Sequence, residues 1–356
     1  MSPRFPRALL VSAVLLTGWA CAQTTPKAAL LALSKQDHTL AIVDPANLHV
    51  LARIPVGDDP HEVVASSDGK TAYVSNYGFG AFHTLTLIDL VGQKPLAVVD
   101  LGALRGPHGL YFEQGKAWFT AEAAKAIGSY DPAAGKIDWI MGTGQDRTHM
   151  LYVFPNGKRI VTTNVSSATV TILEKTEGRA GGPPPGMQPP PGAPGQGGPP
   201  PGPPPTPPGG DWQLTVIPVG RGAEGFDVSR DGKEAWIANA WDGTVSVIDI
   251  AAKKVIDTLA VNVPGANRLK FTADGKLVLI TAGSALVVLD AATRKEVKRL
   301  ADVHGSGGIQ MQPDGLRAYV ACGRDNSVAV IDMKTMEMVG HIDVRGPDGL
   351  AWAAQQ

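Results

Sequence analysis

The chain has 356 residues and a formal net charge of −1, with 32 Lys and Arg residues against 33 Asp and Glu residues. This length allows a large buried core. The balanced charge, with no basic cluster, argues against recognition of nucleic acid or of an anionic membrane surface.

The first residues have the pattern of an export signal. Arg4 and Arg7 precede an apolar run from Ala8 to Ala20 that is too short to span a membrane, so residues 1–22 are predicted to be a secretory signal peptide. The protein is then expected to be periplasmic or secreted. Lipidation of Cys21 is an alternative that the sequence leaves open. If Cys21 is removed, Cys322 is the remaining cysteine, and no internal disulfide is expected.

A repeated unit begins near Asp59. An apolar strand is followed by a Ser-Asp-Gly-Lys turn, in which Gly69 supplies the positive φ of a tight hairpin, and by a second strand that ends at Asn76. A third strand then ends in an aliphatic residue and an aspartate, Ile88-Asp89, and a fourth strand is rich in Val and Leu. The sequence therefore predicts four short antiparallel strands per unit.

The unit recurs along the chain. Equivalent turn glycines are Gly115, Gly157, Gly232, Gly275 and Gly315. Apart from one insertion, the spacing is about 41 to 45 residues, which is typical of a four-stranded propeller blade. No long helical period competes with this pattern.

The two ends of the chain complete each other. The N-terminal part begins within a unit, with strands expected at 30–34, 39–43 and 49–56, and the C-terminal part supplies a single extra strand at 349–353. Pairing of the last strand with the first removes the open sheet edges. The predicted fold is all-β: one domain over 27–353, a seven-bladed β-propeller of four-stranded blades closed by its termini.

An insertion separates two strands of one blade. Residues 175–211 consist mainly of Pro and Gly, so they have few side chains to bury and are predicted to be a disordered, partly extended linker. Two roles remain open for it. It is either a tolerated loop or a segment that contacts a partner protein or the cell wall.

Three strand ends carry a recognisable motif: Tyr73-Val74-Ser75-Asn76, Val161-Thr162-Thr163-Asn164 and Trp236-Ile237-Ala238-Asn239. They resemble the signature of the YVTN (YncE-like) β-propeller repeats, and the resemblance extends over 27–353 apart from the insertion. It implies a fold more than an activity, because similar propellers include lactonase-type hydrolases, streptogramin-type lyases, copper enzymes and exported proteins without assigned chemistry.

Alignment of the units places one residue per blade at the head of each inner strand, around the mouth of the central channel. These residues are His61, His108, His149, Glu224, Asn267, Gly307 and Asp348. Three imidazoles and a carboxylate on consecutive blades are more than a structural repeat requires. The alternative is that these side chains only bond neighbouring loops at a solvated opening.

Imidazole nitrogens with a carboxylate form a ligand set suited to zinc or copper. The candidate metal ligands are therefore His61, His108, His149 and Glu224. Residues expected to line a ligand site beside them are Asn267, Arg268, Asp348, Trp241 and Tyr77. No catalytic residue is assigned.

Two functions follow from these features. The first, which the sequence favours, is an exported propeller that binds a small ligand, glycan or protein on its polar rim without chemistry of its own. The second is a metal-dependent periplasmic hydrolase or lyase, lactonase-like, or a copper enzyme, using the His and Glu cluster. In either case we expect a monomer without a transmembrane segment and without a nucleic-acid partner.

Overall fold

The computed structural model describes residues 24–176, 212–304 and 307–356. The predicted signal peptide, residues 1–22, lies outside this part of the chain, as does almost all of the predicted disordered insertion. Within the described ranges, no helix is both long enough and apolar enough to cross a membrane.

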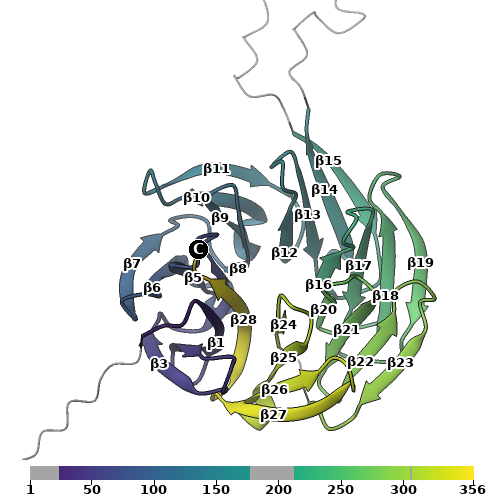
Figure 1. The fold of residues 1–356 in the computed structure, drawn as a ribbon. Helices are drawn as coiled ribbons and strands as arrows, with labels where there is room; N and C mark the ends of the chain where they lie inside the picture. The colour runs from purple at the N-terminus through teal and green to yellow at the C-terminus, as the bar shows by residue number, and fades with distance from the viewer. Residues whose placement is uncertain (1–23, 177–211, 305–306) are drawn as a thin grey trace, which may run out of the picture.

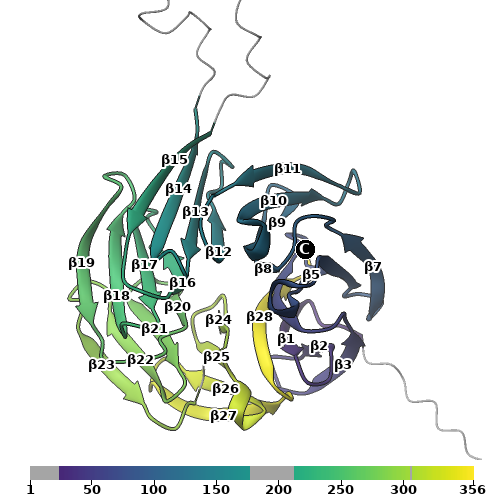
Figure 2. The ribbon, with the colours of Figure 1, turned by 180° about the vertical axis from the view of Figure 1, so that it is seen from behind.

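The described residues form seven sheets, each of four antiparallel strands, arranged in a ring around a central axis (Figure 1). The view from the opposite side shows the same closed ring (Figure 2). The prediction of an all-β, seven-bladed propeller is thereby confirmed.

Each blade has strands in four positions, counted outward from the axis. The inner strands are β4 (Pro60–Ala65), β8 (Pro107–Glu113), β12 (Thr148–Val153), β16 (Ala223–Val228), β20 (Arg268–Phe271), β24 (Ile309–Met311) and β28 (Pro347–Ala354). The second strands are β1 (Ala28–Ser34), β5 (Thr71–Asn76), β9 (Lys116–Ala121), β13 (Arg159–Asn164), β17 (Glu234–Asn239), β21 (Leu277–Ala282) and β25 (Arg317–Cys322).

The third strands are β2 (Thr39–Val43), β6 (Thr84–Asp89), β10 (Ala126–Asp131), β14 (Thr169–Lys175), β18 (Thr244–Asp249), β22 (Ala285–Asp290) and β26 (Ser327–Asp332). The outer strands are β3 (Val50–Pro55), β7 (Lys94–Asp100), β11 (Lys136–Gly142), β15 (Trp212–Pro218), β19 (Lys254–Ala260), β23 (Glu296–Leu300) and β27 (Glu337–Asp343). Short 3-10 turns η1 (Gly78–Gly80), η2 (Glu122–Ala124) and η3 (Gly323–Asp325) follow three of the second strands.

The turns form for the local reasons that the sequence indicates. Gly69 has φ of 67°, a left-handed conformation that residues with a side chain rarely adopt. Asp68 accepts a hydrogen bond from the backbone N–H of Lys70, and Asp89 accepts two, from Val91 and Gly92. These aspartates fix the hairpin turns within each blade.

The hydrophobic core lies between neighbouring blades. The described residues form seven buried clusters, and each cluster joins two adjacent sheets. In one of them, Trp236 of β17 packs against Phe271 of β20 with ring centroids 5.6 Å apart. Outer strands such as β11 and β19 alternate between exposed and half-buried residues, as expected for strands with one solvated face.

The ring closes where the two ends of the chain meet. Strand β28 pairs with β1 in an antiparallel register that sets Ala351 opposite Leu31 and Leu350 opposite Ala32. In Figure 1 the yellow strand β28 lies beside the purple strand β1. The predicted closure by the termini is confirmed.

The boundary of the insertion differs by one residue from the prediction. Lys175 is the last residue of β14, and it pairs with Trp212, the first residue of β15. The prediction placed Lys175 inside the insertion. The backbone pairing extends the strand to Lys175, so the insertion takes the place of a hairpin turn.

Leu350 provides a test of the closure. It is 8 % exposed and packs between the last blade and the first, so Leu350→Ala should lower the free energy of unfolding by about 2–4 kcal/mol. The control is Val339→Ala in β27, where the side chain is 56 % exposed and the loss should stay below about 1 kcal/mol. Urea denaturation measures both. Equal losses for the two variants would contradict a closing role for β28.

Candidate ligand and metal site

The heads of the inner strands meet at one end of the central channel. The residue placed there by five blades is the second of its strand: His61, His108, His149, Glu224 and Asp348. A sixth blade contributes Asn267 and Arg268 at the start of β20. The predicted strand-head residues therefore do converge at one opening.

A β-bulge near the head of these strands aims the side chains into the channel. In β4 the pairing with β5 shifts between Pro60 and Val63, and the same shift occurs in β8, β12 and β16. A bulge inserts one unpaired residue and bends the strand. The extra residue breaks the alternation of a regular strand and leaves the side chain at the bulge free to face the axis.

Hydroxyl groups connect the bulges of β4, β8 and β12 to the next blade. Ser75 accepts a hydrogen bond from the N–H of Glu62 and donates to the carbonyl of His108. Thr120 does the same between Gly109 and His149, at 2.8 and 2.7 Å. The backbone that carries His108 and His149 is thus fixed by the preceding blade.

Neighbouring inner strands approach so closely that some positions require glycine. A Cβ atom added to Gly109 would lie 2.5 Å from the carbonyl oxygen of His149. The equivalent atom on Gly349 would lie 2.7 Å from the carbonyl oxygen of His61. Both distances are shorter than van der Waals contact, so these glycines allow the strand heads to meet.

Gly109→Ala should therefore displace the strand that carries His149. We expect a loss of about 1–3 kcal/mol in the free energy of unfolding, because the backbone must shift to accept the methyl group. Gly142→Ala is the matched control, since no atom lies within 4 Å of a Cβ built there. Thermal or urea unfolding compares the two. A Gly109→Ala variant as stable as the control would show that the close approach is not required.

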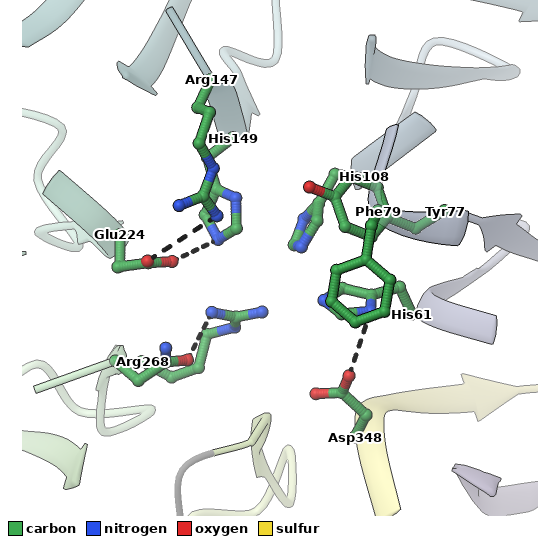
Figure 3. A pocket seen from close by; sticks show the side chains of 10 residues that line it. His61, Tyr77, Phe79, His108, Arg147, His149, Glu224, Arg268 and Asp348 are labelled. Carbon is green, nitrogen blue, oxygen red and sulfur yellow. Dashed lines mark hydrogen bonds and ion pairs between the residues drawn. The ribbon is translucent and has the colours of Figure 1, made fainter. Parts of the chain in front are cut away.

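The strand heads surround a cavity of about 560 Å³ (Figure 3). Its lining residues are His61, Tyr77, Phe79, His108, Arg147, His149, Glu224, Asn267, Arg268 and Asp348. Eight of the nine residues predicted from the sequence belong to this set. Trp241 does not. Its side chain is 56 % exposed and lies over Gly222, outside the set of residues that line the cavity.

The three histidines form a row of neighbouring rings, edge-on between His61 and His108 and tilted between His108 and His149. The ring centroids of His61 and His108 are 4.1 Å apart, and those of His108 and His149 are 3.8 Å apart. His108 is 1 % exposed, and its Nδ1 atom has no hydrogen-bond partner. Burial, followed by the neighbouring His149, holds the pKa of His108 well below its usual value, so His108 is neutral at pH 7.

His149 lies between two carboxylates. Its Nδ1 is 2.5 Å from Oε1 of Glu122, and its Nε2 is 2.6 Å from Oε2 of Glu224. The second contact lacks hydrogen-bond alignment and is mainly electrostatic. Burial acts to lower the pKa of His149, but Glu224 and Glu122 outweigh it and raise the pKa above its usual value. The pKa values of neighbouring imidazoles in one cavity are thus shifted in opposite directions.

Glu122 and Lys35 are site residues that the sequence analysis missed. Glu122 accepts a hydrogen bond of 2.5 Å from the hydroxyl of Tyr77. Lys35 contacts Nδ1 of His61 at 2.5 Å and forms ion pairs with Asp59 and Asp348.

A signal in the sequence could have found both residues. Lys35, Tyr77 and Glu122 each come directly after the second strand of their blade, following Ser34, Asn76 and Ala121. They occupy one repeat position, and only Tyr77 was predicted because it adjoins the clearest motif. Aligning that position across the blades would have added a second ring of site residues.

A buried ion pair crosses the channel below the histidines. The guanidinium of Arg268 donates to Oε1 of Glu62 at 2.7 Å, although the two residues are 206 positions apart. Arg268 is 7 % exposed and Glu62 is 8 % exposed. Arg268 borders both the upper cavity and a second cavity of about 300 Å³ below it. The pair therefore forms the floor of the site.

The donor set fits a transition metal ion. One ligand atom from each of His108, Glu122 and His149 lies within 4.8 Å of the other two. His61 and Glu224 line the same cavity but fall outside this group, whereas Glu122, which the sequence analysis did not name, belongs to it. Glu224 instead faces the other nitrogen of His149, and Tyr77 holds Glu122. Such outer partners orient the ligands of metal sites.

The remaining histidines of the loops do not reach the cavity. His38, His83 and His304 are nearly half exposed, and each contacts an aspartate beside it. Cys322, at the end of β25, is buried and its thiol has a pKa raised to about 11 by burial. A nucleophilic role for this cysteine is therefore disfavoured.

Glu224 makes the stability of the site depend on pH. Burial acts to raise its pKa, but His149 and then Arg268 outweigh burial and lower it to about 2, from 4.5. A carboxylate with a depressed pKa stabilises the folded state above pH 4.5 and loses this contribution as the pH falls toward 2. Protonation of Glu224 at low pH should therefore lower the free energy of unfolding.

In metal-free protein, Glu224→Gln should cost on the order of 3 kcal/mol at pH 6, because it leaves buried His149 short of a counter-ion. The difference from wild type should shrink as the pH falls from 4.5 to 2. Glu296→Gln, on an exposed outer strand, is the control. Urea denaturation across this range measures both, and a difference that does not change with pH would refute the role of Glu224.

Comparison with known proteins places the fold. No protein-family model matches the chain, and no curated protein matches it. Among solved structures, a functionally unknown protein from Desulfotomaculum acetoxidans DSM 771 is similar, with a TM-score of 0.71 and 14% identity, over 92% of this chain and 99% of the other. A candidate 6-phosphogluconolactonase from Bacteroides fragilis NCTC 9343 has a TM-score of 0.68 and 16% identity, over 93% and 99%.

A third similar structure is hydrazine synthase from Kuenenia stuttgartiensis, with a TM-score of 0.63 and 16% identity over 82% of this chain and 89% of the other. At these identities the similarity establishes the seven-bladed propeller fold alone. The neighbours differ in their described activities, so the function has to be argued from the site.

Proposed function

We propose that this propeller binds one zinc or copper ion at His108, His149 and Glu122 and acts as a metal-dependent hydrolase or lyase on a small ligand in the cavity. The observation that carries the proposal is the buried Nδ1 of His108, which lacks a partner in a cavity that also presents His149 and Glu122. A buried polar atom without a partner is costly, and a bound ion would provide one for this group of residues.

When bound, such an ion polarises a carbonyl oxygen of the ligand or lowers the pKa of a bound water. The contact of 2.5 Å between Glu122 and His149 is shorter than the spacing of two ligands on one ion, roughly 3.3 Å from typical zinc distances. A metal ion held by both residues would therefore require His149 and Glu122 to separate slightly. Tyr77 keeps Glu122 in place through its hydroxyl.

His61 has a different role. Lys35 contacts its Nδ1, and burial lowers its pKa, so the imidazole is neutral and carries its proton on Nε2. His61 then serves as a hydrogen-bond donor to an oxygen of the ligand. Asp348, 3.4 Å from Nδ1 of His61, and Lys35 hold the ring in position.

The metal content tests this function. Purified protein incubated with Zn²⁺ and then desalted should retain about one ion per chain. His108→Ala and Glu122→Gln should each lower zinc affinity at least tenfold. His341→Ala is the control, because this histidine lies on an outer strand and its side chain is 68 % exposed. Elemental analysis and a competing chelator measure these changes. Protein that retains no zinc or copper would exclude the proposal.

A second function is supported by the arrangement of His149. In the structure both of its nitrogens already lie close to carboxylates, which would offset the charge of a protonated imidazole without a metal. This favours a propeller that binds a small ligand in the cavity without a metal. The metal-content experiment separates the two functions, because the second requires neither zinc nor copper.

Two broader proposals rest on the sequence. The repeated strand-end motif supports a relationship with the YVTN propellers, and the N-terminal residues support export to the periplasm or the medium.

A further inference from the structure

The cavity has two chemically different walls (Figure 3). On one side, the ring of Tyr77 lies 5.0 Å from that of His61, 5.0 Å from that of His108 and 6.0 Å from that of Phe79. These four rings come from consecutive blades and from the loop between β5 and β6. The wall they form presents flat π surfaces to the cavity.

The opposite wall carries two arginines. Arg268 rises from the head of β20, and Arg147 lies just before β12. Arg147 is 40 % exposed, and its ion pairs with Glu122 and Glu224 are 3.6 and 4.0 Å long. These contacts are longer than hydrogen bonds, so the guanidinium has donors free for an anion in the cavity.

Phe79 combines an exposed side chain with a left-handed backbone conformation. Its side chain is 88 % exposed although it lines the cavity. Its backbone is left-handed, with φ of 51°, between Gly78 at 55° and Gly80 at 86°. A residue with a side chain is strained in this region, and such strain gathers at functional sites. An exposed ring at the mouth of a cavity is suited to cover the flat face of a ligand.

The charges around the cavity limit the charge of the ligand. Five carboxylates, those of Asp59, Glu62, Glu122, Glu224 and Asp348, face three cationic side chains, those of Lys35, Arg147 and Arg268. A divalent ion at the proposed site would balance the two excess negative charges of this group. A ligand with one negative charge then adds little repulsion, whereas a dianion adds more.

We infer that the cavity binds a small aromatic monocarboxylate, with its ring against Phe79 and its carboxylate toward Arg147 and Arg268. The inference rests on the proposed function, because the metal ion supplies part of the positive charge. The cavity volume of about 560 Å³ lies within the range of small-molecule sites. Phe79 selects for a flat ring, and Arg147 selects for the anion.

Benzoate is the probe that tests the inference, with cyclohexanecarboxylate and benzyl alcohol as comparison compounds. Calorimetric titration of the zinc-loaded protein should show benzoate binding at least tenfold tighter than benzyl alcohol, because the alcohol lacks the charge that Arg147 and Arg268 recognise. Phe79→Ala should raise the Kd for benzoate about three- to tenfold and that for cyclohexanecarboxylate less than about twofold.

Two variants provide the comparison. Arg147→Gln should raise the Kd of both carboxylates about tenfold or more, since it removes a charged partner without touching the aromatic wall. Trp241→Ala removes an exposed aromatic residue that does not line the cavity, and it should leave the Kd for benzoate unchanged. Circular dichroism of Phe79→Ala confirms that the fold is retained.

The results separate this inference from the proposed function. Zinc bound at about one ion per chain, with a Kd for benzoate unaffected by Phe79→Ala, overturns the inference alone. The inference also fails if benzyl alcohol binds as tightly as benzoate. A third result is possible: the protein retains no metal, but metal-free protein binds benzoate and Phe79→Ala weakens this binding as expected. This result would support the ligand class and exclude the metal-dependent function.

Discussion

The close approach of the inner strands around the channel is the constraint on which the site depends. Gly109 and Gly349 lie against the carbonyl groups of His149 and His61, at distances that leave no room for a side chain. Because the ring is closed by β28, every blade is held at this spacing. Side chains at the strand heads therefore share one small opening, and groups hundreds of residues apart become direct neighbours.

Burial of so many charges is tolerable because each charged group has partners. Lys35 contacts Asp59, Asp348 and His61, and Arg268 bonds Glu62 across the channel. A buried charge without such partners would be strongly destabilising. The network also keeps the cavity open, because side chains that are bonded to each other cannot fold into it. The protein thus maintains a polar cavity before any ligand binds.

The distribution of side-chain types around the cavity follows the order of the blades. Neighbouring blades in one half of the ring supply the three imidazoles, while the blade that carries β24 places Gly307 at the equivalent position. Arg268 belongs to the blade that precedes the blade of β24. It bonds Glu62 across the channel and forms the floor of the cavity. The open space that results lies above this pair and between an aromatic side and a cationic side. A symmetric repeat has become an asymmetric cavity through substitutions at a few repeat positions.

The repeat pattern of the sequence determined the fold, the blade count and the closure, because hairpin turns and strand alternation are local properties and the period of the units is fixed. Aligning the repeats also identified His61, His108 and His149. Only the tertiary structure shows that Glu122 places a possible ligand atom within 4.8 Å of both His108 and His149. Side-chain length and loop path determine which carboxylate reaches which nitrogen, and these depend on blades packed around an axis rather than on spacing along the chain.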